Sequence, residues 1–93
     1  MTGNTRFYFK NHLVWQVEPV SQTAYIMSKK NDASYLFDNA EKDIWLMIYS
    51  KCTFDEMIVE LNRKYDVLKE QLEKDVKAFL DDVLKEDLIY EIF

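Results

Sequence analysis

The sequence predicts an α+β fold in which a three-stranded antiparallel sheet is followed by three helices. Apolar and polar residues alternate in the N-terminal part of the chain, which indicates strands. Capping patterns followed by apolar residues at helical spacing indicate helices further along. A chain of 93 residues, 48% apolar and with one glycine and one proline, suits a single domain with a sizeable core and no flexible linker.

Three strands are expected before the first helix. Leu13–Val17 alternates along its length, and Pro19 ends this strand because proline cannot donate a ladder hydrogen bond. Residues 23–28 and Ser34–Phe37 form the other two strands, and residues 29–33 form the turn between them, where Asn and Asp tolerate positive φ. Ser34–Phe37 comes last in this meander, so one of its edges is expected to stay open.

Two helix starts follow. The first helix is expected to begin at Asp38 or Asn39, with Glu41 at the capping-box position three residues after Asp38. Thr53 and Glu56 form a clearer capping box for the second helix.

The ends of the chain flank this core. Residues 1–12 are expected to form an N-terminal arm or an extra strand, since residues 6–10 alternate only weakly. Residues 88–93 are expected to lie as an extended tail against the sheet. Residues 13–93 would then form one winged helix-turn-helix-like domain, since winged-helix proteins share these strand and helix elements.

The third helix, expected over residues 68–86, carries more acidic residues than lysines. In a DNA-binding winged-helix protein this last helix enters the major groove, and the binding needs Lys and Arg to displace counterions. The net charge of −5 disfavours nucleic acid and an anionic membrane surface, and suits a protein that meets peptides or other proteins. A winged-helix DNA-binding regulator is therefore the disfavoured alternative.

No residue pattern indicates catalysis, so the chain is not expected to be an enzyme. His12 is the only histidine, expected to be exposed, and Cys52 is the only cysteine, expected to be a small buried hydrophobe. Without a Cys/His cluster, and with Gly3 as the only glycine, neither a metal, a cofactor nor a phosphate-binding loop is expected. The lone cysteine and the lack of a targeting or spanning segment favour the cytoplasm.

Three short motifs occur in order. Residues 37–45 read Phe-Asp-Asn-Ala-Glu-Lys-Asp-Ile-Trp, residues 53–58 read Thr-Phe-Asp-Glu-Met-Ile, and residues 75–80 read Asp-Val-Lys-Ala-Phe-Leu, with Leu-Ile following at 88–89. In order and spacing they resemble the PqqD-like family, small winged-helix-like domains also called RiPP recognition elements. The resemblance extends over residues 13–90.

The sequence departs from this family at three junctions. Asp38 stands where the family has asparagine between strand and helix. Ser50 or Lys51 occupies a glycine position before the second helix, and Asp87 occupies one after the third. A residue other than glycine there implies a different turn or a strained left-handed conformation.

The resemblance implies that the domain binds the leader segment of a ribosomally made precursor peptide. The leader would add as a strand to the open edge of Ser34–Phe37, with the third helix as the other wall of a groove. The domain would then deliver the peptide to a modifying enzyme or leader protease, as in radical-SAM or lasso-peptide pathways. The candidate peptide-binding residues are Ser34, Tyr35, Leu36, Phe37, Gln71, Leu72, Asp75, Val76 and Phe79.

The residues leave other interpretations open. The apolar candidates on the third helix, together with Tyr35 and Phe37, have the spacing of core residues, whereas Leu36 points to the other face and suits ligand contact. Asp75 is either a solvated rim carboxylate or an acceptor for the peptide. The chain is alternatively a plain subunit that docks on an enzyme through apolar faces, and its open edge allows a homodimer by edge pairing or swapping.

Overall fold

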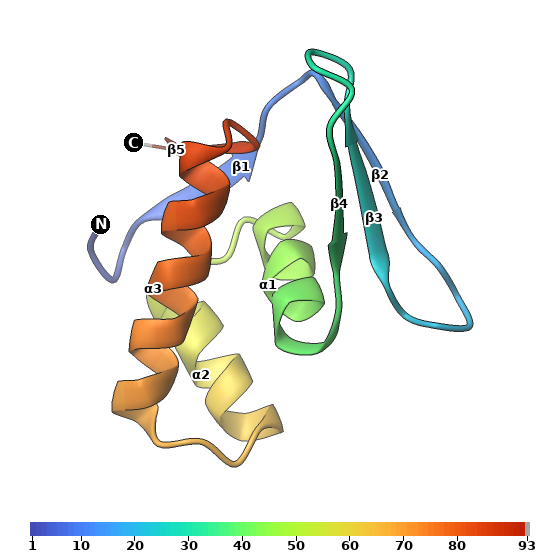
Figure 1. Cartoon of the computed structure of the whole chain (residues 1–93). Coiled ribbons are helices and arrows are strands. Elements are labelled where there is room, and N and C mark those ends of the chain that lie inside the picture. The colour runs from blue at the N-terminus through green and yellow to red at the C-terminus, as the bar shows by residue number, and fades with distance from the viewer. Residues whose placement is uncertain (93) are drawn as a thin grey trace.

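A computed structural model of the chain describes residues 1–92, which form two small antiparallel sheets and three helices (Figure 1). In chain order the elements are β1 (Arg6–Phe9), β2 (Leu13–Val17), β3 (Ala24–Ser28), β4 (Ser34–Phe37), α1 (Asn39–Tyr49), α2 (Phe54–Lys64), α3 (Lys69–Lys85) and β5 (Ile89–Ile92). The predicted α+β fold, with its three-stranded antiparallel sheet and three helices, is confirmed. None of the helices in these 92 residues is long and apolar enough to cross a membrane.

Strands β2, β3 and β4 form the sheet that we call the wing sheet, with β3 in the centre. Ala24, Ile26 and Ser28 of β3 are buried, whereas Tyr25 and Met27 between them are exposed. Successive side chains of a strand point to opposite faces. The wing sheet therefore has an inner face packed on the helices and an outer face open to solvent (Figure 1).

The second sheet joins the two ends of the chain, because β1 pairs antiparallel with β5. Phe7 of β1 and Ile89 of β5 are 0% and 1% exposed, and their strands contact α1 and α3. The prediction that the C-terminal tail lies against the wing sheet is therefore wrong, because burial of these two side chains holds the tail beside β1. Phe93, at the end of that predicted tail, lies outside the described residues.

Aromatic side chains connect the two sheets to α1. Trp45 is 0% exposed, and its ring centroid lies 4.6 Å from that of Phe9, 5.4 Å from Phe37 and 6.2 Å from Trp15. Aromatic pairs at such separations contribute about 0.5–1.5 kcal/mol beyond their buried area. The cluster fixes where β4 ends relative to the helices.

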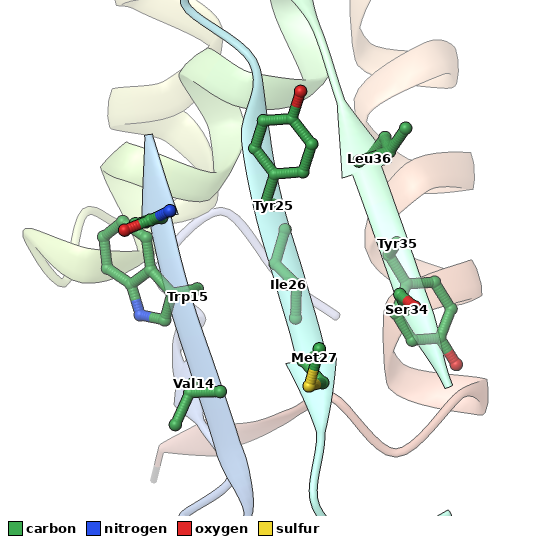
Figure 2. A pocket seen from close by; sticks show the side chains of 9 residues that line it. Val14, Trp15, Tyr25, Ile26, Met27, Ser34, Tyr35 and Leu36 are labelled. Atoms are coloured by element: carbon green, nitrogen blue, oxygen red, sulfur yellow. The ribbon is translucent and has the colours of Figure 1, made fainter. Parts of the chain in front are cut away.

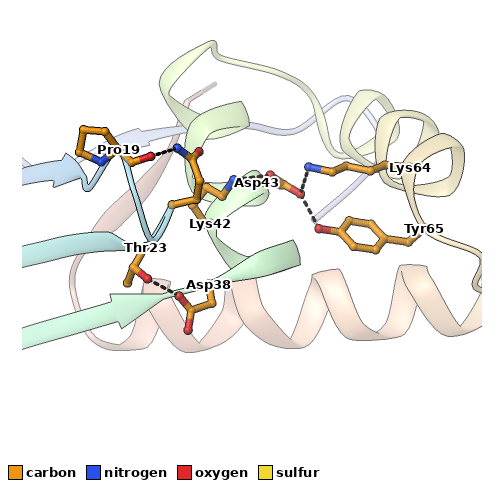
Figure 3. Close-up of polar contacts among 8 residues, drawn as sticks. Pro19, Thr23, Asp38, Lys42, Asp43, Lys64 and Tyr65 are labelled. Atoms are coloured by element: carbon orange, nitrogen blue, oxygen red, sulfur yellow. Dashed lines mark hydrogen bonds and ion pairs between the residues drawn. The ribbon is translucent and has the colours of Figure 1, made fainter.

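The two predicted capping boxes have different outcomes. Thr53 and Glu56 exchange the expected hydrogen bonds, at 2.7 and 3.1 Å, so the capping box of α2 is confirmed. Asp38 precedes α1 but makes no side-chain cap, so that prediction is wrong. Its carboxylate instead accepts a hydrogen bond from the Thr23 hydroxyl at 2.6 Å, which ties the start of β3 to the end of β4 (Figure 3).

Two of the predicted departures from glycine produce strained backbone. Lys51, before α2, has φ of 57°, and Asp87, after α3, has φ of 64°. Both lie in the left-handed region, where a side chain costs about 1 kcal/mol relative to glycine. Ion pairs of Asp87 with Lys30 and Lys10, at 2.9 and 3.3 Å, hold the second turn in place.

Candidate functional site: the β4 edge, a helical pocket and the outer sheet face

Strand β4 presents a free backbone edge. Within residues 1–92 it pairs with β3 alone, and the C-terminal strand β5 pairs with β1 instead. The Ser28 amide donates to the Ala33 carbonyl at 2.9 Å, and backbone groups alternate in direction along an antiparallel strand. Those of Tyr35 and Phe37 are therefore directed towards β3, and those of Ser34 and Leu36 towards the free edge.

Helix α3 lies beside this edge, and side chains bridge the gap. The Tyr35 hydroxyl donates to Glu86 Oε2 at 3.2 Å, and the rings of Phe37 and Phe79 meet edge to face at 5.0 Å. Residues early in β4 thus meet residues late in α3, so the two elements run in opposite directions (Figure 1). Phe37 and Phe79 are 8% and 7% exposed, which agrees with their interpretation as core.

A pocket of about 230 Å³ opens beyond the end of β4, between the three helices. It brings together four of the candidates on the third helix with residues that sequence reasoning did not select. Its lining comprises Leu72, Asp75, Val76 and Phe79 with Ala40, Glu41, Ile44, Leu61, Tyr65 and Val67. Asp75 and Glu41 are exposed carboxylates, whereas the α3 residues Leu72, Val76 and Phe79 are buried. The pocket is apolar within and acidic at its mouth.

The structure places the β4 candidates elsewhere. Ser34, Tyr35 and Leu36 line a larger hollow of about 620 Å³ on the wing sheet, with Val14, Trp15, Gln16, Tyr25, Ile26 and Met27 (Figure 2). Leu36 and Met27 are 61% and 54% exposed. Only Ser34, Tyr35 and Leu36 of this set were predicted. The other six residues of this hollow lie on β2 and β3. The only sequence feature that could have indicated them is the presence of apolar side chains on both faces of these strands.

Charge is negative on the side of α3 that faces β4. Gln71 donates to Asp75 Oδ1 at 2.8 Å and orients that carboxylate. Burial and the nearby charges of Asp38 and Asp82 raise the pKa of Glu41. Partial burial and the hydrogen bond to Glu86 raise the pKa of Tyr35. Carboxylates from α1 and α3 therefore face each other.

A separate polar cluster joins α1 to the end of α2 (Figure 3). Asp43 of α1 accepts a hydrogen bond from the Tyr65 hydroxyl at 2.7 Å, and lies 2.9 Å from Lys64 and 3.3 Å from Lys42. Burial alone would raise the pKa of Asp43, but these three partners outweigh it and lower the pKa. The cluster joins α1 to the end of α2 and is structural.

The arrangement contains little that suits catalysis. Burial, with Glu56 and Glu60 nearby, raises the pKa of Cys52, which keeps the thiol protonated and unreactive. His12 is half-buried rather than exposed, because its carbonyl accepts the Lys29 amide at 2.8 Å and holds it at the sheet. No group of three or more potential metal ligands occurs among residues 1–92. The notable features are a free strand edge, an apolar pocket and an apolar sheet face.

Comparison with protein families matches residues 27–89, from β3 into β5, to the profile described as "Coenzyme PQQ synthesis protein D (PqqD)". The chain belongs to the PqqD family. The match covers β4, all three helices and every residue predicted to bind the peptide, so the resemblance carried by the three motifs is confirmed.

Solved structures share the fold of this PqqD-family chain. TbiB1 in complex with the TbiA(beta) leader peptide is 15% identical, with a TM-score of 0.81 over 88% of this chain and 93% of that one. Lasso peptide synthetase B1 complexed with the leader peptide is 10% identical, with a TM-score of 0.82 over 90% of this chain and 96% of that one. A search of curated proteins gave no significant match.

Proposed function

We propose that this PqqD-family domain binds the leader segment of a ribosomally made precursor peptide and presents it to a modifying enzyme or leader protease. The observation that carries the proposal is the free edge of β4 beside α3, on a fold shared with two proteins solved in complex with leader peptides. The domain itself performs no chemistry in this proposal.

The backbone supplies the affinity. The outward groups of Ser34 and Leu36 offer donors and acceptors that an extended peptide completes, as in other cases of strand addition. This pairing depends little on the peptide's sequence. Selectivity comes from side chains that reach the pocket lined by Leu72, Asp75, Val76 and Phe79.

Hydrogen exchange measured by NMR on the whole chain tests this proposal. The probe is a synthetic leader peptide from a short open reading frame chosen near the gene for this chain. The amides of Ser34 and Leu36 exchange rapidly in the free protein and gain protection with the leader, whereas those of Tyr35 and Phe37 are protected in both states. The free edge of β2 serves as an internal control. Protection appearing only at β2, or nowhere, would contradict the proposal.

The outer face of the wing sheet favours an additional function in docking a partner enzyme. Val14, Tyr25, Met27 and Leu36 are 45%, 43%, 54% and 61% exposed and lie together (Figure 2). Exposed apolar side chains that gather on one face of a small domain favour an interaction site there. A leader added to β4 would extend this same face, so one enzyme surface would contact domain and leader together.

Substitution of Met27 separates the two functions. Met27→Lys places a charge in the centre of the outer face without touching the β4 edge. We expect the variant to bind the leader as the parent does, and to lose association with the enzyme in analytical ultracentrifugation. Equal loss of both would show that a single surface serves them. A homodimer paired through the β4 edge stays a prediction, and it would compete with the leader.

A further inference from the structure

One flank of α3 carries an acidic stripe. The stripe consists of the carboxylates of Asp75, Asp82 and Glu86, with the neutral Gln71 preceding them. Successive members are separated by four, seven and four positions, which places them on the same side of a helix. The hydrogen bond from Tyr35 to Glu86 shows that this flank faces β4. The lysines of α3 occupy other positions, so the stripe lines the groove without alternating charge.

The carboxylates on the β4-facing side of α3 have no cationic partner in the described part of the chain. Some acids elsewhere in the chain are paired, as Asp43 is with Lys42 and Lys64 and Asp87 is with Lys10 and Lys30. Within residues 1–92, none of four carboxylates on or facing this side of α3 forms an ion pair with a lysine, arginine or histidine: these are Glu41, Asp75, Asp82 and Glu86. The charges of Asp38 and Asp82 also contribute to the raised pKa of Glu41. Without a bound peptide, this side of α3 therefore carries negative charge that no cation of the described residues balances.

We propose that the segment bound in this groove is cationic, with Lys or Arg at alternate positions on its α3-facing side and uncharged residues between them. This inference rests on the proposed function and names the class of leader. A strand added to β4 directs every second side chain towards α3 and the others to the outer face beside Leu36. Only the first set meets the acidic stripe.

The spacing of the stripe agrees with this pattern. The helical rise over the four positions from Asp82 to Glu86 is about 6 Å, and two residues of an extended strand span about 6.8 Å. Two basic side chains at positions i and i+2 therefore reach the two carboxylates together. Adjacent basic residues do not, because one of them points to the opposite face.

Four acetylated dodecapeptides provide the test. In three of them Thr alternates with Lys, Gln or Glu, and the fourth has the composition of the Lys peptide with its lysines adjacent. Each is titrated into the isotope-labelled whole chain, and affinity is read from the amide shifts of Ser34 and Leu36. We expect the alternating Lys peptide to bind most tightly, by about threefold for each ion pair formed, and the Glu peptide to bind most weakly.

Two matched variants localise the effect. Asp82→Asn is expected to reduce the advantage of the Lys peptide about threefold, whereas Asp81→Asn, an equal charge change on another flank, leaves it unchanged. Equal binding of the Lys and Gln peptides, or of the two Lys peptides, would overturn the inference while leaving strand addition intact. If neither these peptides nor the synthetic leader moved the Ser34 and Leu36 amides, the proposed function itself would fail.

Discussion

The hydroxyl of Tyr35 on β4 donates a hydrogen bond of 3.2 Å to Glu86 at the end of α3, and so joins the start of the strand to the end of the helix. An incoming strand beside β4 must pass this contact. Phe37 and Phe79 meet further along the same gap and form its buried floor. The contact between β4 and α3 is therefore apolar and buried at Phe37 and Phe79, and polar and exposed at Tyr35 and Glu86.

Removing this bridge is expected to favour peptide binding. Tyr35→Phe loses an exposed hydrogen bond, which costs at most about 1 kcal/mol of folding free energy. The variant should bind the leader as tightly as the parent or up to about fivefold more tightly. Isothermal titration calorimetry measures the affinity, and urea unfolding measures the stability. Weaker binding would mean that the hydroxyl contacts the peptide directly.

Leu36→Asp is expected to weaken leader binding. Leu36 is 61% exposed, so the domain should still fold, but a carboxylate replaces an apolar cross-strand contact with the added strand. We expect the affinity for the leader to fall about five- to tenfold, as measured by titration of tryptophan fluorescence. Val59→Asp is the matched control, because Val59 is 55% exposed and lies on α2. Equal effects of the two changes would point to net charge alone.

Lys51→Gly is expected to stabilise the fold. The residue has φ of 57°, and glycine adopts this conformation without the steric cost of a side chain. A gain of about 0.5–1 kcal/mol in the free energy of unfolding is expected in urea. Lys51→Ala also removes the contact of the ammonium with the Tyr8 ring, 4.9 Å away, but keeps Cβ. If the alanine variant gained as much stability, the backbone would not be the cause.

Asp43 is expected to make stability depend on acid pH. Because its pKa is lower in the folded protein than in the unfolded chain, its contribution is present above the unfolded pKa, near 4. The contribution is lost as the pH falls through the folded pKa. Urea unfolding of the parent between about pH 6 and pH 3 should therefore show a steeper loss of stability than that of Asp43→Asn. Parallel curves would assign the acid sensitivity to other groups.

Local patterns in the sequence were enough to predict much of the fold. Leu13–Val17 and Ser34–Phe37 occur at the predicted positions, because alternation with a period of two reports which side chains are buried. The capping box of Thr53 and Glu56 was also predictable, since both partners lie within one helical turn. The same rule was wrong for Asp38, because Thr23, distant in sequence, binds its carboxylate.

The candidate site was predictable only in part. Four of the five α3 candidates, Leu72, Asp75, Val76 and Phe79, meet in one pocket that Gln71 does not line, and Ser34, Tyr35 and Leu36 line a different hollow. A period in sequence shows which residues share a face of one element. It does not show which face of another element lies opposite.

By itself, the sequence determined the types and order of the elements, the net negative charge, the positions of strained turns and the family of the chain. Only the tertiary structure decided that the C-terminal strand pairs with β1, which leaves β4 uncovered beside an acidic flank of α3. The physical reason is that capping and alternation act between neighbours in the chain. Strand pairing and the contact between Tyr35 and Glu86 depend on where burial of Phe7, Trp45 and Ile89 places distant segments.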